Sequence, residues 1–107
     1  MTNGKSIENI TRHDEVSEKS IERYLVSRVK EAGGVCLKYA NANMTGYPDR
    51  VILLPHGKTA WVELKSAGKK PTKLQAIRIQ AMRDLGREVH VIDNREMVDK
   101  LIKTTQR

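Results

Sequence analysis

Hydrophobic and polar positions follow two periods along this chain, and each change of period marks a new element. The first clear pattern begins at Ser17, a residue type that favours helix N-caps. Apolar residues then recur at three- and four-residue spacing, and these are Ile21, Leu25, Val29 and Ala32. Gly33 and Gly34 follow and favour a helix end. The pattern predicts a helix from about residue 18 to residue 32, with one face on a core.

Short apolar runs typical of strands follow this helix. They cover residues 35–39, 50–54, 60–65 and 88–92. The segment 55–58 contains Pro and Gly and predicts a turn, so the second and third runs should form a hairpin. Residues 40–48, with two Asn, a Gly and a Pro, are predicted to form a loop.

Two more helices are predicted in the second half of the chain. Thr72 can cap the first of them, and Gly86 closes it. Its expected core-facing stripe is Leu74, Ile77, Ala81 and Leu85. Asn94 can cap a short last helix carrying Met97, Val98, Leu101 and Ile102. The resulting order, αβββαβα, predicts an α/β fold in which helices flank a small mixed four-stranded sheet.

Length and composition bound what this chain can be. Its 107 residues suffice for one domain, which we place at residues 15–107, after a polar and aperiodic stretch, 1–14, expected to be a mobile arm. No apolar run is long enough for a membrane span, and the polar start has no signal-peptide core. The single cysteine, Cys36, excludes an intrachain disulfide, so we expect a reducing, cytoplasmic location, in a bacterium or for a virus inside its host.

The charge balance points to a polyanionic partner. With 20 Lys and Arg against 13 Asp and Glu, the formal net charge is +7, which favours nucleic acid over a membrane. Aromatic residues make up only 4% of the chain, too few for a protein that stacks a row of bases. Contacts to nucleic acid should therefore be made mostly to phosphates.

Three polar residues in the predicted hairpin suggest chemistry. Asp49 opens one strand directly after Pro48, and the partner strand carries Glu63 and Lys65 on one face. The turn should place Asp49 opposite Glu63, within one residue of register. Two close carboxylates repel unless a cation lies between them, and oxygen ligands suit Mg²⁺ or Mn²⁺ better than zinc. The alternative is an exposed strand face with solvated charges.

These residues, with their surroundings, resemble the PD-(D/E)XK nuclease superfamily and its VRR-Nuc family. The resemblance rests on the segments 46–51 (GYPDRV) and 62–65 (VELK), and it extends from about Val16 to Ile102. It implies a restriction-endonuclease-like core with Asp49 and Glu63 as catalytic metal ligands. It also implies that the backbone carbonyl of Leu64 is a third metal ligand and that Lys65 is the catalytic lysine. Gln75 matches a family glutamine near the active site; the alternative is that its side chain is an ordinary amide on the helix surface.

The first helix offers two candidates for a further carboxylate at the metal. On a helical projection, Glu18 falls nearer the centre of the apolar stripe than Glu22 does, so Glu18 is favoured as the metal ligand and Glu22 is expected to be solvated. The alternative for Glu18 is a favourable charge at the helix N-terminus. The residues expected to bind DNA are Arg50, Lys69, Lys70 and Lys73.

These observations predict an Mg²⁺- or Mn²⁺-dependent endonuclease that hydrolyses DNA phosphodiester bonds. The chain shows no sequence-reading motif, so recognition of DNA shape is expected. Stand-alone members of the family resemble Holliday-junction resolvases, which implies a homodimer acting on branched or four-way DNA. Two alternatives stay open: a monomeric flap or nicking nuclease, and a catalytically silent DNA-binding module.

Overall fold

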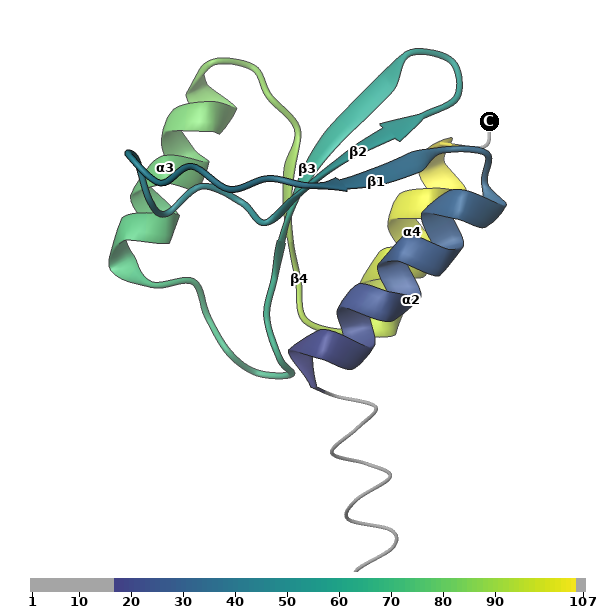
Figure 1. The fold of residues 1–107 in the computed structure, drawn as a ribbon, viewed down its shortest axis with the longest axis horizontal. Coiled ribbons are helices and arrows are strands. Elements are labelled where there is room, and N and C mark those ends of the chain that lie inside the picture. Colours follow the sequence, from purple (N-terminus) through teal and green to yellow (C-terminus); the bar gives the residue numbers. More distant parts are fainter. Residues whose placement is uncertain (1–16, 106–107) are drawn as a thin grey trace, which may run out of the picture.

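The computed structural model describes residues 17–105, and the predicted arm at residues 1–14 lies outside them. Within the described range the elements follow the predicted order αβββαβα (Figure 1). The helices are α2 (Glu18–Glu31), α3 (Lys73–Asp84) and α4 (Arg95–Thr105). The strands are β1 (Val35–Lys38), β2 (Arg50–Leu54), β3 (Lys58–Leu64) and β4 (Val89–Ile92).

The strands form a mixed sheet in the order β1-β2-β3-β4. The β1–β2 and β2–β3 pairs are antiparallel, and β4 runs parallel to β3. In the β2–β3 hairpin, β3 begins at Lys58, before the predicted start at residue 60, because the chain reverses within residues 55–57. His56 and Gly57 both have positive φ (67° and 74°), which makes this tight reversal possible.

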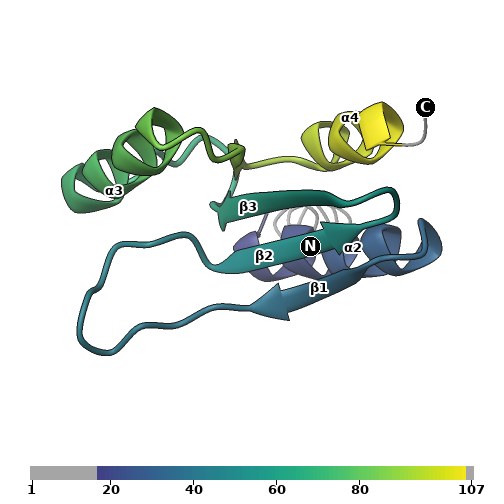
Figure 2. The same ribbon diagram turned by 90° about the horizontal axis from the view of Figure 1, so that it is seen from above.

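Helices cover both faces of the sheet, with α2 and α4 on one side and α3 on the other (Figures 1 and 2). The larger core lies under α2 and α4. The predicted stripe of α2 is confirmed, since Ile21, Leu25 and Val29 are fully buried there. The smaller core lies under α3 and contains Ile79, Met82 and Val89.

The predicted core-facing stripe of α3 is wrong. Leu74, Ile77 and Leu85 are 41%, 55% and 77% exposed, and the buried residues of this helix are Ile79 and Met82. Both sets have helical spacing, so the sequence pattern alone does not decide between them. Tertiary packing decides it, because Ile79 and Met82 form a buried cluster with Val89 of β4. The β1–β2 loop lies on the same side of the molecule as α3 and contacts Leu74 at Gly46 (Figure 2).

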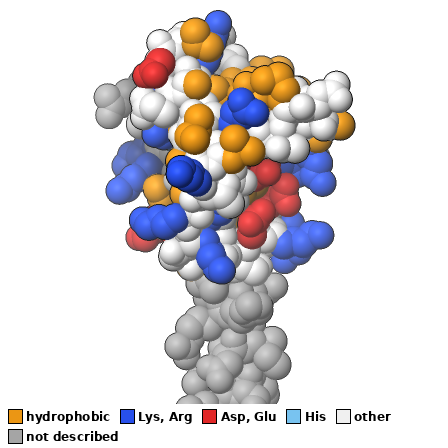
Figure 3. Space-filling model, turned by 90° about the vertical axis from the view of Figure 1, so that its left-hand side faces the viewer, with side chains coloured by type: hydrophobic (Ala, Val, Ile, Leu, Met, Phe, Trp, Pro, Cys, Tyr) orange, Lys and Arg blue, Asp and Glu red, His pale blue; other side chains and the backbone are white. Residues whose placement is uncertain are grey.

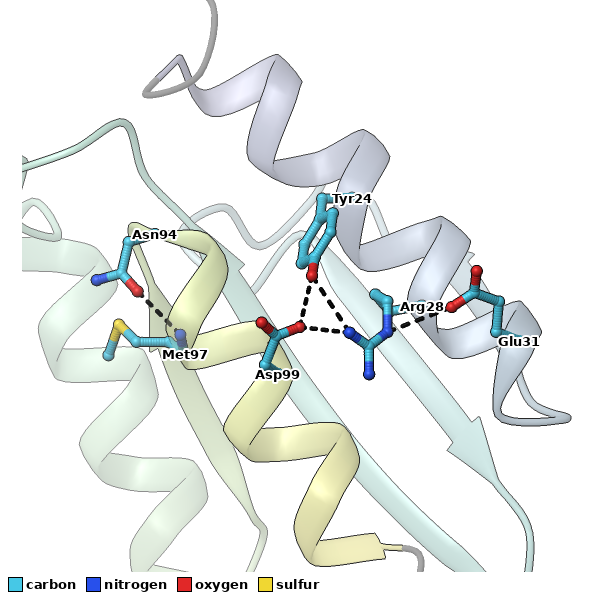
Figure 4. A network of polar contacts seen from close by, with 6 residues as sticks. All are labelled: Tyr24, Arg28, Glu31, Asn94, Met97 and Asp99. Carbon is cyan, nitrogen blue, oxygen red and sulfur yellow. Dashed lines mark hydrogen bonds and ion pairs between the residues drawn. The ribbon is translucent and has the colours of Figure 1, made fainter. Parts of the chain in front are cut away.

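A polar network holds α2 against α4 at the surface (Figure 4). The Tyr24 hydroxyl donates to Asp99 Oδ1 at 2.6 Å, and Arg28 Nη1 donates to the same oxygen at 2.5 Å. Arg28 Nε also lies 3.3 Å from Glu31 Oε1. Asn94 caps α4 as predicted, accepting from the Met97 backbone N–H at 2.9 Å. The bonds of Tyr24 and Arg28 to Asp99 join α2 to α4.

None of the helices in residues 17–105 is both long and apolar enough to cross a membrane.

Candidate active site

Asp49 and Glu63 meet where the β2–β3 hairpin ends. Asp49 directly precedes β2, and the pairing of Arg50 with Val62 places it beside Glu63, as the sequence predicted. The backbone N–H of Leu64 donates to Asp49 Oδ2 at 3.1 Å. This bond fixes one carboxylate oxygen of Asp49 against the end of β3.

Glu63 is a buried acid in an incomplete environment. Its side chain is only 2% exposed, and its Oε2 lies 3.5 Å from Lys65 Nζ. Its other oxygen, Oε1, is buried without a hydrogen-bond partner. Burial, followed by repulsion from Asp49, raises the pKa of Glu63 to about 7, although Lys65 acts in the opposite direction. An unsatisfied buried oxygen costs about 1–3 kcal/mol, so this group needs a proton or a cation.

Lys65 immediately follows β3, and its backbone is bonded to β4, the neighbour of β3 on the side away from β2. Its backbone N–H donates to the Ile92 carbonyl at 3.0 Å, which extends the parallel pairing of β3 with β4. The side chain is 15% exposed, so the ammonium group is partly shielded from solvent beside Glu63.

The two glutamates of α2 have different surroundings. Glu18 is mostly exposed. The part of its carboxylate that is buried raises its pKa, and the negative charge of Asp49 adds to this effect, whereas Lys65 lowers the pKa. The charge of Glu18 therefore acts on the site. Glu22 was predicted to be solvated, and this prediction is wrong. Its Oε2 accepts from Arg50 Nε at 3.0 Å and lies 2.9 Å from Arg50 Nη2.

The donor set suits a hard divalent cation that keeps much of its water. In residues 17–105, no three Asp, Glu, His or Cys side chains lie close enough together to form a ready-made metal site. Mg²⁺ is commonly held by only one or two carboxylates plus water. Asp49 and the unpartnered oxygen of Glu63 fit that description. The geometry leaves Glu18 outside a direct three-carboxylate set.

The predicted DNA-contacting cations divide into two groups. Arg50 is 12% exposed, and it bonds to Glu22 and, at 3.3 Å, to the Cys36 carbonyl. Its guanidinium is thus used within the fold. The lysines at the mouth of the site, Lys69, Lys70 and Lys73, are exposed. Figure 3 shows Lys and Arg side chains around a patch of acidic ones on the side of the molecule that α3 borders.

Gln75 has a structural role at the start of α3. Its Oε1 accepts from the Thr72 backbone N–H at 2.9 Å, and its own N–H donates to the Thr72 hydroxyl at 3.2 Å. This reciprocal pair is a capping box. The side-chain carbonyl is therefore occupied.

An aromatic cluster beside the site was missed by the sequence reasoning. The Tyr39 ring packs edge-on against Trp61 and Tyr47, with centroids 5.2 and 6.4 Å away. The Arg78 guanidinium lies 5.0 Å from the centre of the Tyr47 ring. A pocket of about 230 Å³ is lined by Tyr39, Tyr47 and Asp49, among others. The signal in the sequence was Trp61, two residues before Glu63 and so on the same face of β3.

Known proteins that resemble this chain include a phage protein and a solved structure, whereas no family model matches the chain. The chain is 39% identical over 82 residues to "Putative nuclease p44" of Acyrthosiphon pisum secondary endosymbiont phage 1, covering 77% of this chain and 88% of that protein. A solved structure described as a VRR_NUC domain superposes with a TM-score of 0.75 at 31% identity, covering 80% of this chain and 94% of that one.

The structural match confirms the predicted α/β fold class, and both matches confirm the resemblance drawn from the GYPDRV and VELK segments. The chain belongs to the VRR-Nuc family of nucleases.

Proposed function

We propose that this chain is an Mg²⁺- or Mn²⁺-dependent endonuclease that cuts branched DNA as a homodimer. The observation that carries the proposal is the buried Glu63 carboxylate, which has one unpartnered oxygen beside Asp49 and one oxygen next to Lys65. A site that served only to bind DNA would have no use for a buried acid with a raised pKa. Perturbed buried carboxylates cluster at catalytic sites.

Each side chain has a distinct part in the proposed reaction. A divalent cation held by Asp49 and Glu63, with the Leu64 carbonyl as a further ligand, would neutralise the phosphodiester and lower the pKa of water. Asp49 keeps its orientation because the Leu64 N–H holds one of its oxygens. Lys65, held beside Glu63, orients the attacking water and stabilises the charge that builds on the phosphate. Glu18 contributes its charge from the N-terminal end of α2.

The basic lysines beside this site support DNA as the substrate. Lys69, Lys70 and Lys73 are exposed on the loop and helix that follow Lys65, where they can contact the phosphates flanking the scissile bond. The proposal of a four-way junction cut by a dimer rests on the family resemblance, because two symmetric cuts need two active sites.

The test is cleavage of a defined set of DNA substrates. Four-way junctions, flaps, nicked duplexes and linear duplexes are incubated with the protein in Mg²⁺, Mn²⁺, Ca²⁺ or chelator. We expect cutting of the junction in Mg²⁺ and Mn²⁺ only. Lys65→Ala should lower the rate by roughly 10²–10⁴-fold and leave DNA binding nearly intact.

The other outcomes separate the alternatives. Cleavage in excess chelator would contradict the metal mechanism. Preferential cutting of flaps or nicks by a single-chain particle would identify a monomeric structure-specific nuclease. Junction binding with no cleavage in any metal would identify a silent DNA-binding module.

A further inference from the structure

A basic groove runs along α2 on the side that faces β1, outside the site described above. It has a volume of about 580 Å³ and is formed by residues of α2, β1 and β2. Its lining residues are Lys19, Glu22, Arg23, Val26, Ser27, Lys30, Lys38 and Arg50. Five of these are Lys or Arg and one is acidic, so the lining carries a large excess of positive charge.

The helix places its cations in a row. Lys19, Arg23 and Lys30 are separated by four and seven residues, a spacing that puts them on one helix face. On a helical projection, the centre of this row lies about 140° from the centre of the buried stripe of Ile21, Leu25 and Val29, so the cations lie away from the core. Lys19 and Lys30 are both exposed. Eleven residues of helix span about 16 Å, a length over which one DNA strand, at roughly 3.4 Å per step, passes several phosphates.

The strands complete the groove near the candidate active site. Lys38 and Arg50 are direct partners in the β1–β2 ladder, so both lie at the end of the sheet where Asp49 begins the hairpin. The one acidic group of the groove, Glu22, is paired with Arg50. The negative charge that could repel a phosphate is therefore already neutralised within the fold.

We propose that this groove binds the sugar-phosphate backbone of a DNA duplex arm, as a second contact surface besides Lys69, Lys70 and Lys73. This inference rests on the proposed nuclease function. Lys69, Lys70 and Lys73, on the loop before α3 and at the start of α3, contact DNA beside the active site. The groove contacts DNA along α2. Two basic tracks that meet at one cluster of carboxylates suit a substrate whose arms diverge from a branch point.

The chemistry of the groove favours nucleic acid over other anionic partners. Among the described residues, its uncharged lining consists of Val26 and Ser27, so much of the apolar surface of the groove comes from the aliphatic stems of Lys and Arg side chains, whose charged ends remain available to phosphates. No aromatic side chain from residues 17–105 lines it, so stacking of bases is not expected there. Phosphate contacts by Lys and Arg position a duplex without reading its sequence, as expected for a protein that recognises shape.

The experiment compares two matched pairs of lysines. Lys19→Gln/Lys30→Gln removes two positive charges from the groove, and Lys100→Gln/Lys103→Gln removes two exposed charges from α4. Binding of a fluorescent four-way junction is measured in chelator by anisotropy over a range of salt concentrations. Because each lost phosphate contact lowers the salt slope by about 1, we expect a decrease of about 2 for the groove variant. The α4 variant should keep the wild-type slope.

A rescue variant and control measurements distinguish a failure of the groove proposal from a failure of the nuclease proposal. Lys19→Arg/Lys30→Arg should restore the wild-type slope, and thermal unfolding checks that every variant is folded. An unchanged slope for the groove variant, or an equal loss in the α4 variant, would overturn the groove while leaving the nuclease proposal standing. Loss of binding to anionic lipid vesicles with unchanged DNA binding would also overturn it, in favour of a membrane. Wild-type protein that binds no DNA at all would contradict both proposals.

Discussion

At the scale of single residues, the buried acid Glu63 makes the stability of the metal-free protein depend on pH. Its pKa is about 7 in the folded chain against 4.5 for a free glutamate. As pH rises from 4.5 to 7, the unfolded chain has already lost this proton and the folded chain still holds it. The free energy of unfolding therefore decreases over that window, by roughly 3 kcal/mol at most.

Glu63→Gln should remove this dependence. Urea unfolding in chelator at pH 5 and pH 8 should show the wild type losing stability at pH 8 relative to the variant. Mg²⁺ should stabilise the wild type at pH 8 and leave the variant unchanged, since binding to the native state alone raises its stability. A wild type that gains stability relative to the variant between pH 5 and pH 8 would contradict the raised pKa.

The two glutamates of α2 should respond differently to neutralisation. Glu18→Gln removes an exposed charge that acts on Asp49 and Lys65, so cleavage should fall by roughly tenfold or more with little change in stability. Glu22→Gln breaks the pair with Arg50, a bond to a charged group of the kind worth about 1.5–3 kcal/mol. Cleavage rates and urea midpoints measured together separate the two, and a larger rate loss in Glu22→Gln would reverse their roles.

At the scale of elements, the start of α3 combines a helix cap with the glutamine that the family resemblance places near the active site. Gln75→Glu keeps an acceptor at this position, and glutamate is itself a standard capping-box residue. It removes the side-chain NH₂ donor. We expect the free energy of unfolding to stay within about 0.5 kcal/mol of the wild-type value and the cleavage rate to fall roughly tenfold. Thr72→Ala is the matched control: it removes the cap, costs about 1 kcal/mol, and should leave the cleavage rate of the folded protein unchanged.

The elements also show how far the sequence alone could predict this fold. The helix α2 and the β2–β3 hairpin were predictable because their signals are local: a cap, a stripe, a turn and a strand period. The pairing of Asp49 with Glu63 followed from the hairpin register. The buried face of α3 was not predictable, because packing of Ile79 and Met82 with Val89 of β4 determines it, and that contact leaves no signal within the helix itself.

The same limit applies to the candidate site. The segments around Asp49, Glu63 and Lys65 were visible in the sequence. The helical projection placed Glu18 nearer the core than Glu22, whereas Glu18 is exposed and Glu22 is half-buried against Arg50. The partner of Glu22 was not visible, because the Arg50 guanidinium reaches it across 28 positions of the chain. Side-chain pairs of this kind depend on packing between elements and carry no periodic signal.

At the scale of the whole molecule, the described part of the chain, residues 17–105, has two groups of exposed apolar residues outside the Asp49, Glu63 and Lys65 cluster. One is the face of α3 formed by Leu74, Ile77 and Leu85, and Figure 3 looks onto the side of the molecule where α3 lies. The other consists of Val35, Leu37 and Leu53 on β1 and β2, which are 52%, 44% and 43% exposed. Neighbouring apolar side chains exposed in this way commonly mark a protein interface.

The proposed dimer should form through the face of α3. Leu85 is the most exposed large hydrophobic residue of the described chain, and Ile77 lies two helical turns before it on the same face. Ile77→Asp/Leu85→Asp places charges in this surface and removes no buried side chain, so the monomer should stay folded while the dimer dissociates. Val35→Asp/Leu53→Asp, a directly paired position on β1 and β2, is the matched control and should leave the dimer intact.

Sedimentation at micromolar concentration, with and without junction DNA, gives the mass of each variant. A twofold dimer carries two active sites at a fixed separation, and it doubles the basic surface that holds the DNA. The α3 variant should sediment as a single chain and nick one strand of a four-way junction per encounter, while the wild type and the β1–β2 variant cut both. A wild type with the mass of one chain that still makes paired cuts would contradict the dimer. Dissociation by the β1–β2 variant alone would move the interface to the sheet.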